Sequence, residues 1–178
     1  MTHRPTVSIA DPPTELLAEP GWSEPTKQLL PRGIGRTFVS GEPEGDRVRV
    51  RYFRRDADGA LVGRAWFGPG TEGPPAHVHG GCMSALLDEA MGLACWISER
   101  KVLAGRLDVR FRAILPLGSL CVVEAWIDKI DGRHVTTRSR LLGADGTVHA
   151  KGEGLFVQLT QAQIDVMADE WRKRAIPQ

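Results

Sequence analysis

The sequence predicts an α+β fold in which a curved antiparallel sheet wraps around one long central helix. Two segments with the two-residue alternation of half-buried strands precede a single long helical pattern. That helical pattern is apolar around most of its circumference, so it belongs inside the molecule. Several further strand patterns follow, separated by links too short for crossover helices, which favours sequential antiparallel pairing.

The first 45 residues differ from the remainder of the chain. They are rich in proline and show no sustained hydrophobic periodicity. We expect such a segment to wrap around the domain or fray rather than to act as a functional lid. The expected organisation is an N-terminal extension at 1–45, a central domain at 46–160 and a C-terminal helix at 161–178.

The central domain is expected to open with a strand pair. Residues 47–52 alternate arginine with apolar or aromatic side chains, as a half-buried strand does. Asp58-Gly59 predicts a tight turn, and Ala60–Phe67 predicts the returning strand. Glycines and prolines at 68–75 end that strand in a loop.

The long helix follows this loop. From Met83 to Ile97, apolar residues recur at spacings of three and four, and Leu93, Cys95 and Trp96 add apolar surface elsewhere around the helix. We therefore expect this helix to be buried.

The remaining segments predict strands and one terminal helix. Arg106–Arg112 alternates polar and apolar residues, and Asp131-Gly132-Arg133 is a plausible hairpin turn between two further strands. Ala144-Asp145-Gly146 predicts the next turn, which leads into a last strand at Thr147–Leu159. Residues 160–174 predict an amphipathic helix with Thr160 as its N-cap.

The composition argues against several classes of protein. The chain has 23 basic and 22 acidic residues, a net charge of +1, which gives no reason to expect a nucleic-acid or anionic-membrane partner. No apolar run approaches the roughly 18 residues of a membrane span, and no secretory signal pattern is recognisable. Three cysteines form neither a metal motif nor an even disulfide framework. We expect a cytoplasmic protein.

The residues that open the helix carry the chemical signal. Gly80 and Gly81 are expected to leave the first N–H groups of the helix unobstructed. These donors and the positive end of the helix dipole suit a carbonyl oxygen that becomes negative during attack. Asp88 lies about two turns further along on roughly the same face. A carboxylate in so apolar a helix is costly to bury unless it has partners or a task.

The spacing between Gly81 and Asp88 predicts a site shared by two chains. Seven residues advance a helix by about 10 Å, which is too far for both groups of one chain to contact the same reacting carbon at about 3 Å. Two antiparallel helices from two chains would bring Gly81 of one chain to Asp88 of the other. The predicted assembly is therefore a symmetric dimer.

His79-Gly80-Gly81, followed by Asp88 nine residues after the histidine in a strand-loop-helix context, resembles the hotdog thioesterases of the PaaI-like (4HBT) superfamily. The resemblance covers roughly residues 47–159. It implies the hotdog fold, a homodimer that can pair again as a dimer of dimers, and hydrolysis of acyl-CoA thioesters without a metal or cofactor.

The resemblance also implies roles for individual residues. Gly81 matches the residue whose N–H polarises the thioester carbonyl, with Gly80 assigned to substrate binding beside it. Asp88 matches the acid that acts as nucleophile or as general base. His79 matches the motif histidine that helps to hold the site. One departure is that Ala104-Gly105-Arg106 contains no hydroxyl where many relatives carry Ser or Thr.

Three arginines on one strand are candidate substrate-binding residues. Arg106, Arg110 and Arg112 could meet the phosphates of CoA, since guanidinium groups bind phosphate well. The alternative is that they form only the solvated face of the strand.

Other assignments remain open from the sequence. Cys82, at the helix start, allows a Cys–His mechanism, although a small buried residue is the commoner explanation. A metal site of His77, His79 and Asp88 lacks a further ligand at zinc spacing, and Glu89 is expected to be solvated or ion-paired. The alternative functions are a non-catalytic acyl-CoA-binding protein and a hotdog hydratase or dehydratase.

Overall fold

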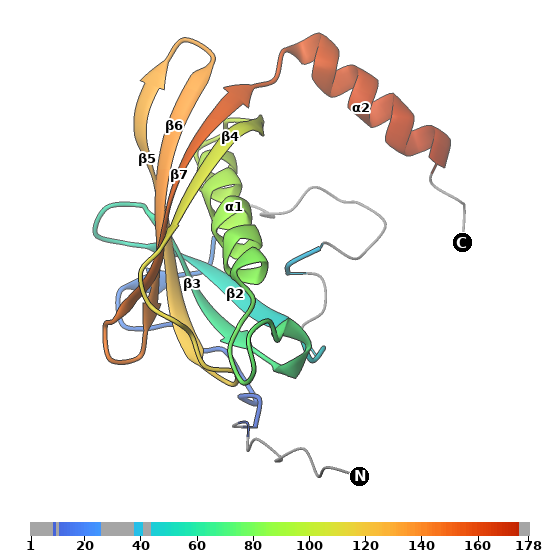
Figure 1. The fold of residues 1–178 in the computed structure, drawn as a ribbon. Helices are drawn as coiled ribbons and strands as arrows, with labels where there is room; N and C mark the ends of the chain where they lie inside the picture. Colours follow the sequence, from blue (N-terminus) through green and yellow to red (C-terminus); the bar gives the residue numbers. More distant parts are fainter. Residues whose placement is uncertain (1–8, 10, 26–37, 41–43, 175–178) are drawn as a thin grey trace.

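A seven-stranded antiparallel sheet curves around one long helix, α1, in the computed structural model of the chain (Figure 1). The structure describes residues 9, 11–25, 38–40 and 44–174. This arrangement confirms the predicted α+β class and the hotdog fold. In chain order the elements are β1 (Trp22–Ser23), β2 (Val48–Arg55), β3 (Leu61–Phe67), the short 3₁₀ helix η1 (Pro69–Thr71), α1 (Gly80–Ile97), β4 (Val102–Phe111), β5 (Leu120–Asp131), β6 (His134–Gly143), β7 (Val148–Gln158) and α2 (Gln161–Arg174).

Helix α1 fills the concave side of the sheet, and its burial confirms the prediction from its apolar circumference. A fully buried leucine contributes roughly 1.5–3 kcal/mol relative to an exposed one, so this contact is a major source of stability. The inward residues of the strands that join the same core include Val123, Ala125 and Val135, all fully buried. The buried residues of α1 are Met83, Leu86, Leu87, Ala90, Met91, Leu93, Ala94 and Cys95.

The strand order confirms one part of the predicted pairing and corrects another. Strands β5, β6 and β7 pair in sequence, and glycines with positive φ (Gly132 at 54° and Gly146 at 81°) lie in the two turns between them. Strand β4, however, does not pair with β5. It lies at the far edge of the sheet beside β7, while β3 pairs with β5. The reason is that α1 carries the chain across the concave face, so the next strand begins at the opposite edge.

Strand β4 is also more exposed than its alternating pattern predicts. Leu103 and Phe111 are each 52% exposed, and Leu107 is 37% exposed. Only Val102 is buried, with Val109 packed against the core from a partly buried position. The apolar side chains of this edge strand are therefore largely open to solvent in the single chain.

The described part of the N-terminal segment lies along the opposite edge of the sheet. Strand β1 pairs antiparallel with β2, and the Trp22 ring packs against Phe53 with ring centroids 5.8 Å apart. Arg51 of β2 forms ion pairs with Glu15 at 3.3 Å and Glu24 at 2.6 Å. These contacts attach a proline-rich segment to the domain through charge pairs and one aromatic contact.

Helix α2 leads away from the sheet (Figure 1). Thr160 caps it as predicted: its hydroxyl oxygen accepts a hydrogen bond from the Gln163 N–H at 3.3 Å. Neither of the two described α-helices combines the length and the apolar character needed to cross a bilayer.

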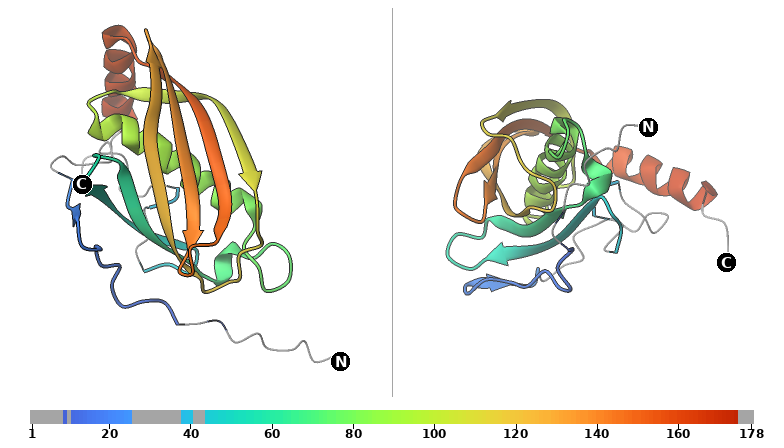
Figure 2. Two further views of the ribbon diagram at one scale, coloured as in Figure 1. Left: turned by 90° about the vertical axis from the view of Figure 1, so that its left-hand side faces the viewer. Right: turned by 60° about the horizontal axis from the view of Figure 1, so that its bottom comes forward.

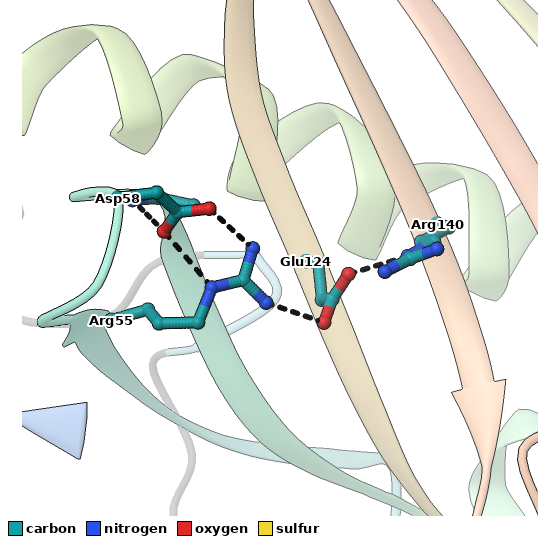
Figure 3. A network of polar contacts seen from close by, with 5 residues as sticks. Arg55, Asp58, Glu124 and Arg140 are labelled. Atoms are coloured by element: carbon teal, nitrogen blue, oxygen red, sulfur yellow. Dashed lines mark hydrogen bonds and ion pairs between the residues drawn. The ribbon is translucent and has the colours of Figure 1, made fainter. Parts of the chain in front are cut away.

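A network of charged side chains joins the β2–β3 hairpin to β5 and β6 (Figure 3). Glu124 is only 7% exposed, and it accepts hydrogen bonds from Arg55 Nη1 at 2.8 Å and from Arg140 Nε. Arg55 also donates to both carboxylate oxygens of Asp58, each at 2.9 Å. The Arg55 guanidinium lowers the pKa of Asp58 to about 2. The buried carboxylate is thus held by two cations.

Candidate active site

The loop that leads into α1 is fixed by hydrogen bonds on both sides. The Val78 N–H donates to the Leu115 carbonyl and the His79 N–H donates to the Thr71 carbonyl, each at 2.8 Å. Thr71 is buried, and its hydroxyl donates to the Gly68 carbonyl at 2.7 Å. The position of the helix start is therefore determined by the surrounding strands and loops.

His79 is the N-cap residue of α1. Its Nδ1 accepts a hydrogen bond from the Gly81 N–H at 2.9 Å, so a neutral His79 carries its proton on Nε2. A side-chain acceptor at this position satisfies one of the unpaired N–H groups of the first turn. The expectation that the Gly81 N–H is unobstructed is thus wrong for this conformation, because the exposed imidazole must turn aside before Gly81 can donate to a ligand.

Gly80 offers the second backbone donor at the helix start. None of the residues that the structure describes accepts a hydrogen bond from its N–H. A Cβ added at Gly80 would lie 3.0 Å from Cζ of Phe111, so the Phe111 ring of β4 rests directly against this glycine. The helix start therefore combines an N–H group that no described residue occupies with an apolar wall.

Asp88 lies half-buried in the middle of α1. Within the described ranges, no hydrogen bond or ion pair involves its carboxylate. Burial raises the pKa of Asp88 above its usual range, because desolvation disfavours the charged form. A half-buried acid with a raised pKa and no structural partner is the kind of group that serves as a general base or nucleophile.

Glu89, the next residue, is held differently. The Tyr52 hydroxyl, itself buried, donates to Glu89 Oε1 at 2.9 Å. Burial raises the pKa of Glu89, while hydrogen bonds from Tyr52 and Ser40 act in the opposite direction. The expectation that Glu89 is solvated or ion-paired is wrong, because its neighbours donate neutral hydrogen bonds to a partly buried carboxylate. Glu89 thus has a hydrogen-bond partner, whereas Asp88 has none in the part of the chain that the structure describes.

The structure gives little support to Cys82 as a nucleophile or to His77 as a metal ligand. Burial raises the pKa of the Cys82 thiol, against the lowering effect of the Arg47 charge, so the reactive thiolate is disfavoured. The His77 ring lies against its own loop, with Nδ1 2.8 Å from the Pro75 carbonyl oxygen. Among the described residues, no three His, Cys, Asp or Glu side chains converge as a metal site would require.

The three candidate arginines are not brought to the helix start. Arg106 and Arg110 lie on the face of β4 opposite to Phe111, and they and Arg112 line a hollow on the outside of the sheet. The Ala104–Arg106 stretch, which lacks the hydroxyl, contains an irregularity in the pairing of β4 with β7. Such bulges alter the direction of the side chains around them.

Phe111 and Tyr52 were not identified from the sequence as part of the site. Phe111 shares the inward face of β4 with Val109, so two-residue periodicity could have placed it on that face. Tyr52 gave no such signal, because its partner Glu89 is 37 residues away.

Comparisons with known protein families, sequences and structures all find thioesterases. Residues 76–150 match the family model of the thioesterase superfamily. Acyl-coenzyme A thioesterase THEM4 of Xenopus laevis is 31% identical over 135 residues, which are 75% of this chain and 55% of that protein. The crystal structure of protein RHA08564, a thioesterase superfamily protein, has a TM-score of 0.58 and 33% identity, covering 62% of this chain and 54% of that chain.

A solved complex with a ligand shares the fold. The crystal structure of a hypothetical thioesterase protein with coenzyme A from Streptococcus pneumoniae TIGR4 has a TM-score of 0.58 at 13% identity, and the match covers 65% of this chain and 91% of that chain. At this identity the likeness concerns the fold alone. The chain spans about half the length of the curated relatives it matches.

Proposed function

Since the chain belongs to the thioesterase superfamily, we propose that it hydrolyses acyl-CoA thioesters to the free acid and CoA. The observation that carries the proposal is the half-buried Asp88, which has a raised pKa and no partner among the described residues, on the same helix as the glycine start. The similarity to acyl-coenzyme A thioesterases supplies the substrate class.

In the proposed reaction, the thioester carbonyl accepts a hydrogen bond from the Gly81 N–H. His79 turns aside to release that group, and the Gly80 N–H lies beside it. In one route, Asp88 of a second protomer takes a proton from water as the water oxygen adds to the carbonyl carbon; the C–S bond then breaks, and the CoA sulfur leaves with that proton. In the other route, the Asp88 carboxylate attacks the carbonyl carbon directly, and the C–S bond breaks as the anhydride forms, so that CoA leaves as a thiolate that takes a proton from solvent. Water then hydrolyses the anhydride, which releases the acid and restores Asp88. Backbone donors are effective here because they stabilise charge that develops on the carbonyl oxygen.

The second protomer is part of this proposal. About 10 Å of helix separates Gly81 from Asp88, so one chain does not bring both to one carbon. The edge strand β4 offers a pairing surface, since no strand of the described part of the chain lies along its outer side and Leu107 and Phe111 are exposed beside it. We propose a homodimer through this edge, and a dimer of dimers remains a prediction.

Substitution of Phe111 tests the dimer. Phe111→Arg places a charge on the proposed contact, and it should shift the protein towards monomers and reduce thioester hydrolysis in parallel. Sedimentation velocity and a thiol-release assay on the same samples measure the two effects. Full activity in a strictly monomeric variant would contradict a shared site.

Substitution of Asp88 tests the reaction itself. Asp88→Asn should lower kcat by roughly 10²–10⁴-fold, the usual contribution of a positioned acid or base. Glu89→Gln is the matched control, because it removes an equal charge one residue away and keeps an oxygen acceptor for Tyr52. It should stay within a few-fold of the original kcat. Equal kcat values for both variants would refute the role of Asp88.

The same assay separates hydrolysis from simple binding. The missing hydroxyl at Ala104–Arg106 and the capped Gly81 N–H are the features that favour a non-catalytic acyl-CoA-binding protein. Calorimetry with a non-hydrolysable acyl-CoA, run beside thiol release on short, long and aromatic acyl-CoAs, distinguishes the two. Binding without release of CoA would identify the binding protein.

A further inference from the structure

The left view of Figure 2 shows the outer face of the sheet, on the side away from α1. Side chains of this face line a basic hollow. Its volume is about 730 Å³, which falls within the usual size range of ligand sites, roughly 300–1,000 Å³. Strands β4, β5, β6 and β7 all contribute to it. Its cationic lining consists of Arg106, Arg110, Arg112, Arg138, Arg140 and Lys151, against the two carboxylates of Asp108 and Glu153.

Three of these cations face one another across neighbouring strands. Arg110 of β4 lies directly opposite Lys151 of β7, and Lys151 lies directly opposite Arg140 of β6. Like charges in such cross-strand positions destabilise a sheet. A row of three cations is therefore a local cost to stability, which a bound anion would offset.

The carboxylates nearby neutralise only part of this charge. Asp108 pairs with Arg110 at 3.2 Å, and Glu124 pairs with Arg140. Asp128 and Glu153 pair with Arg138 at 3.0 and 3.8 Å. The remaining cations, Arg106, Arg112 and Lys151, form no ion pair with any residue that the structure describes.

One aromatic side chain borders the cations. Trp126 of β5 is partly exposed, lines the hollow, and lies directly opposite Arg138 in the register of β5 and β6. Guanidinium groups bind phosphate oxygens in a bidentate manner, and an exposed indole offers a surface on which a nucleobase can stack.

We propose that this hollow binds the phosphates of a nucleotide, with Arg106, Arg112 and Lys151 as the principal contacts and Trp126 against the base. Two sources share this chemistry, namely the 3′-phosphorylated adenosine diphosphate end of CoA and a free nucleotide. The first source rests on the proposed function, and the second does not. The residues from β5, β6 and β7 were not among the sequence-derived candidates.

Calorimetry with adenosine 3′,5′-bisphosphate tests the site without reference to catalysis. Arg106→Glu and Lys151→Glu should each weaken its binding by at least about tenfold, and the wild-type affinity should fall as salt screens the charges. Lys173→Glu, an equal change in charge on the exposed helix α2, is the control and should bind as the wild type does. Arg106→Gln, checked by its circular-dichroism melting curve, provides a milder variant in case charge reversal disturbs folding.

Kinetics then identify the source of the nucleotide. If the hollow binds the nucleotide end of CoA, the ratio of the KM for acyl-CoA to the KM for acyl-pantetheine should rise about tenfold in Lys151→Glu. If Lys151→Glu weakens the binding of adenosine 3′,5′-bisphosphate but leaves this KM ratio unchanged, the ligand is a free nucleotide. The proposal is overturned if the wild type does not bind the bisphosphate. It is also overturned if Lys173→Glu weakens bisphosphate binding as much as Arg106→Glu and Lys151→Glu do. Because calorimetry needs no turnover, a failure of the proposed hydrolysis is distinguishable from a failure of this site.

Discussion

Removal of Arg55 should destabilise the fold measurably, because Arg55 links the buried Glu124 to the exposed Asp58 (Figure 3). Arg55→Met removes the 2.8 Å hydrogen bond to Glu124, whose side chain is 9% exposed. A hydrogen bond to a charged group contributes about 1.5–3 kcal/mol, and complete loss of a buried ion's partners costs about 3–5 kcal/mol. Glu124 keeps Arg140, so we expect the free energy of unfolding to fall by about 2 kcal/mol.

A second arginine of β2 supplies a matched control. Arg51 also pairs with two carboxylates, but Glu15 and Glu24 are 62% and 64% exposed. Exposed ion pairs contribute about 0–1 kcal/mol, so Arg51→Met should lose less than about 1 kcal/mol.

Thermal unfolding followed by circular dichroism measures both variants. For a chain of this size, 1 kcal/mol corresponds to about 2–4 °C in Tm, so Arg55→Met should melt about 4–8 °C lower and Arg51→Met less than about 4 °C lower. The combination of Arg55→Met with Glu124→Gln should lose less than the sum of the single changes, because the two share one interaction. Equal losses for the two arginine variants, or full additivity in the double variant, would refute this account of the network.

Two further predictions concern the candidate active site. Because burial raises the pKa of Asp88, kcat should increase with pH along an acidic limb above the ordinary value of 3.8, and Asp88→Asn should abolish that limb. The raised folded-state pKa means that this carboxyl group stabilises the fold below its unfolded pKa and loses that contribution as pH rises through the folded pKa. Asp88→Asn should therefore raise Tm at pH 7. A lower Tm in the variant would contradict the inference that burial of the charged Asp88 carboxylate destabilises the fold. His79→Ala removes the N-cap of α1 and should lower stability by about 1 kcal/mol, whereas unchanged melting would show that the cap is not formed in solution.

The sequence by itself determined the helices, strands and turns, and it singled out the two groups to which we assign the chemistry. Helix α1 was predictable because its apolar residues recur at the helical period, and the turns because they contain Gly132 and Gly146. Gly81 and Asp88 could be singled out from their spacing along one helix. These signals are local, since each depends only on residues a few positions apart.

The tertiary structure alone decided which strands and side chains meet. Strand β4 lies beside β7 and not β5, which exposes Leu107 and turns Arg106 to the outer face of the sheet. The bond between Tyr52 and Glu89 joins residues 37 positions apart, and it distinguishes two adjacent acids that look alike in the sequence. Contacts of this kind depend on how the sheet closes around α1, and that closure is set by the packing of the whole core, which no local pattern encodes.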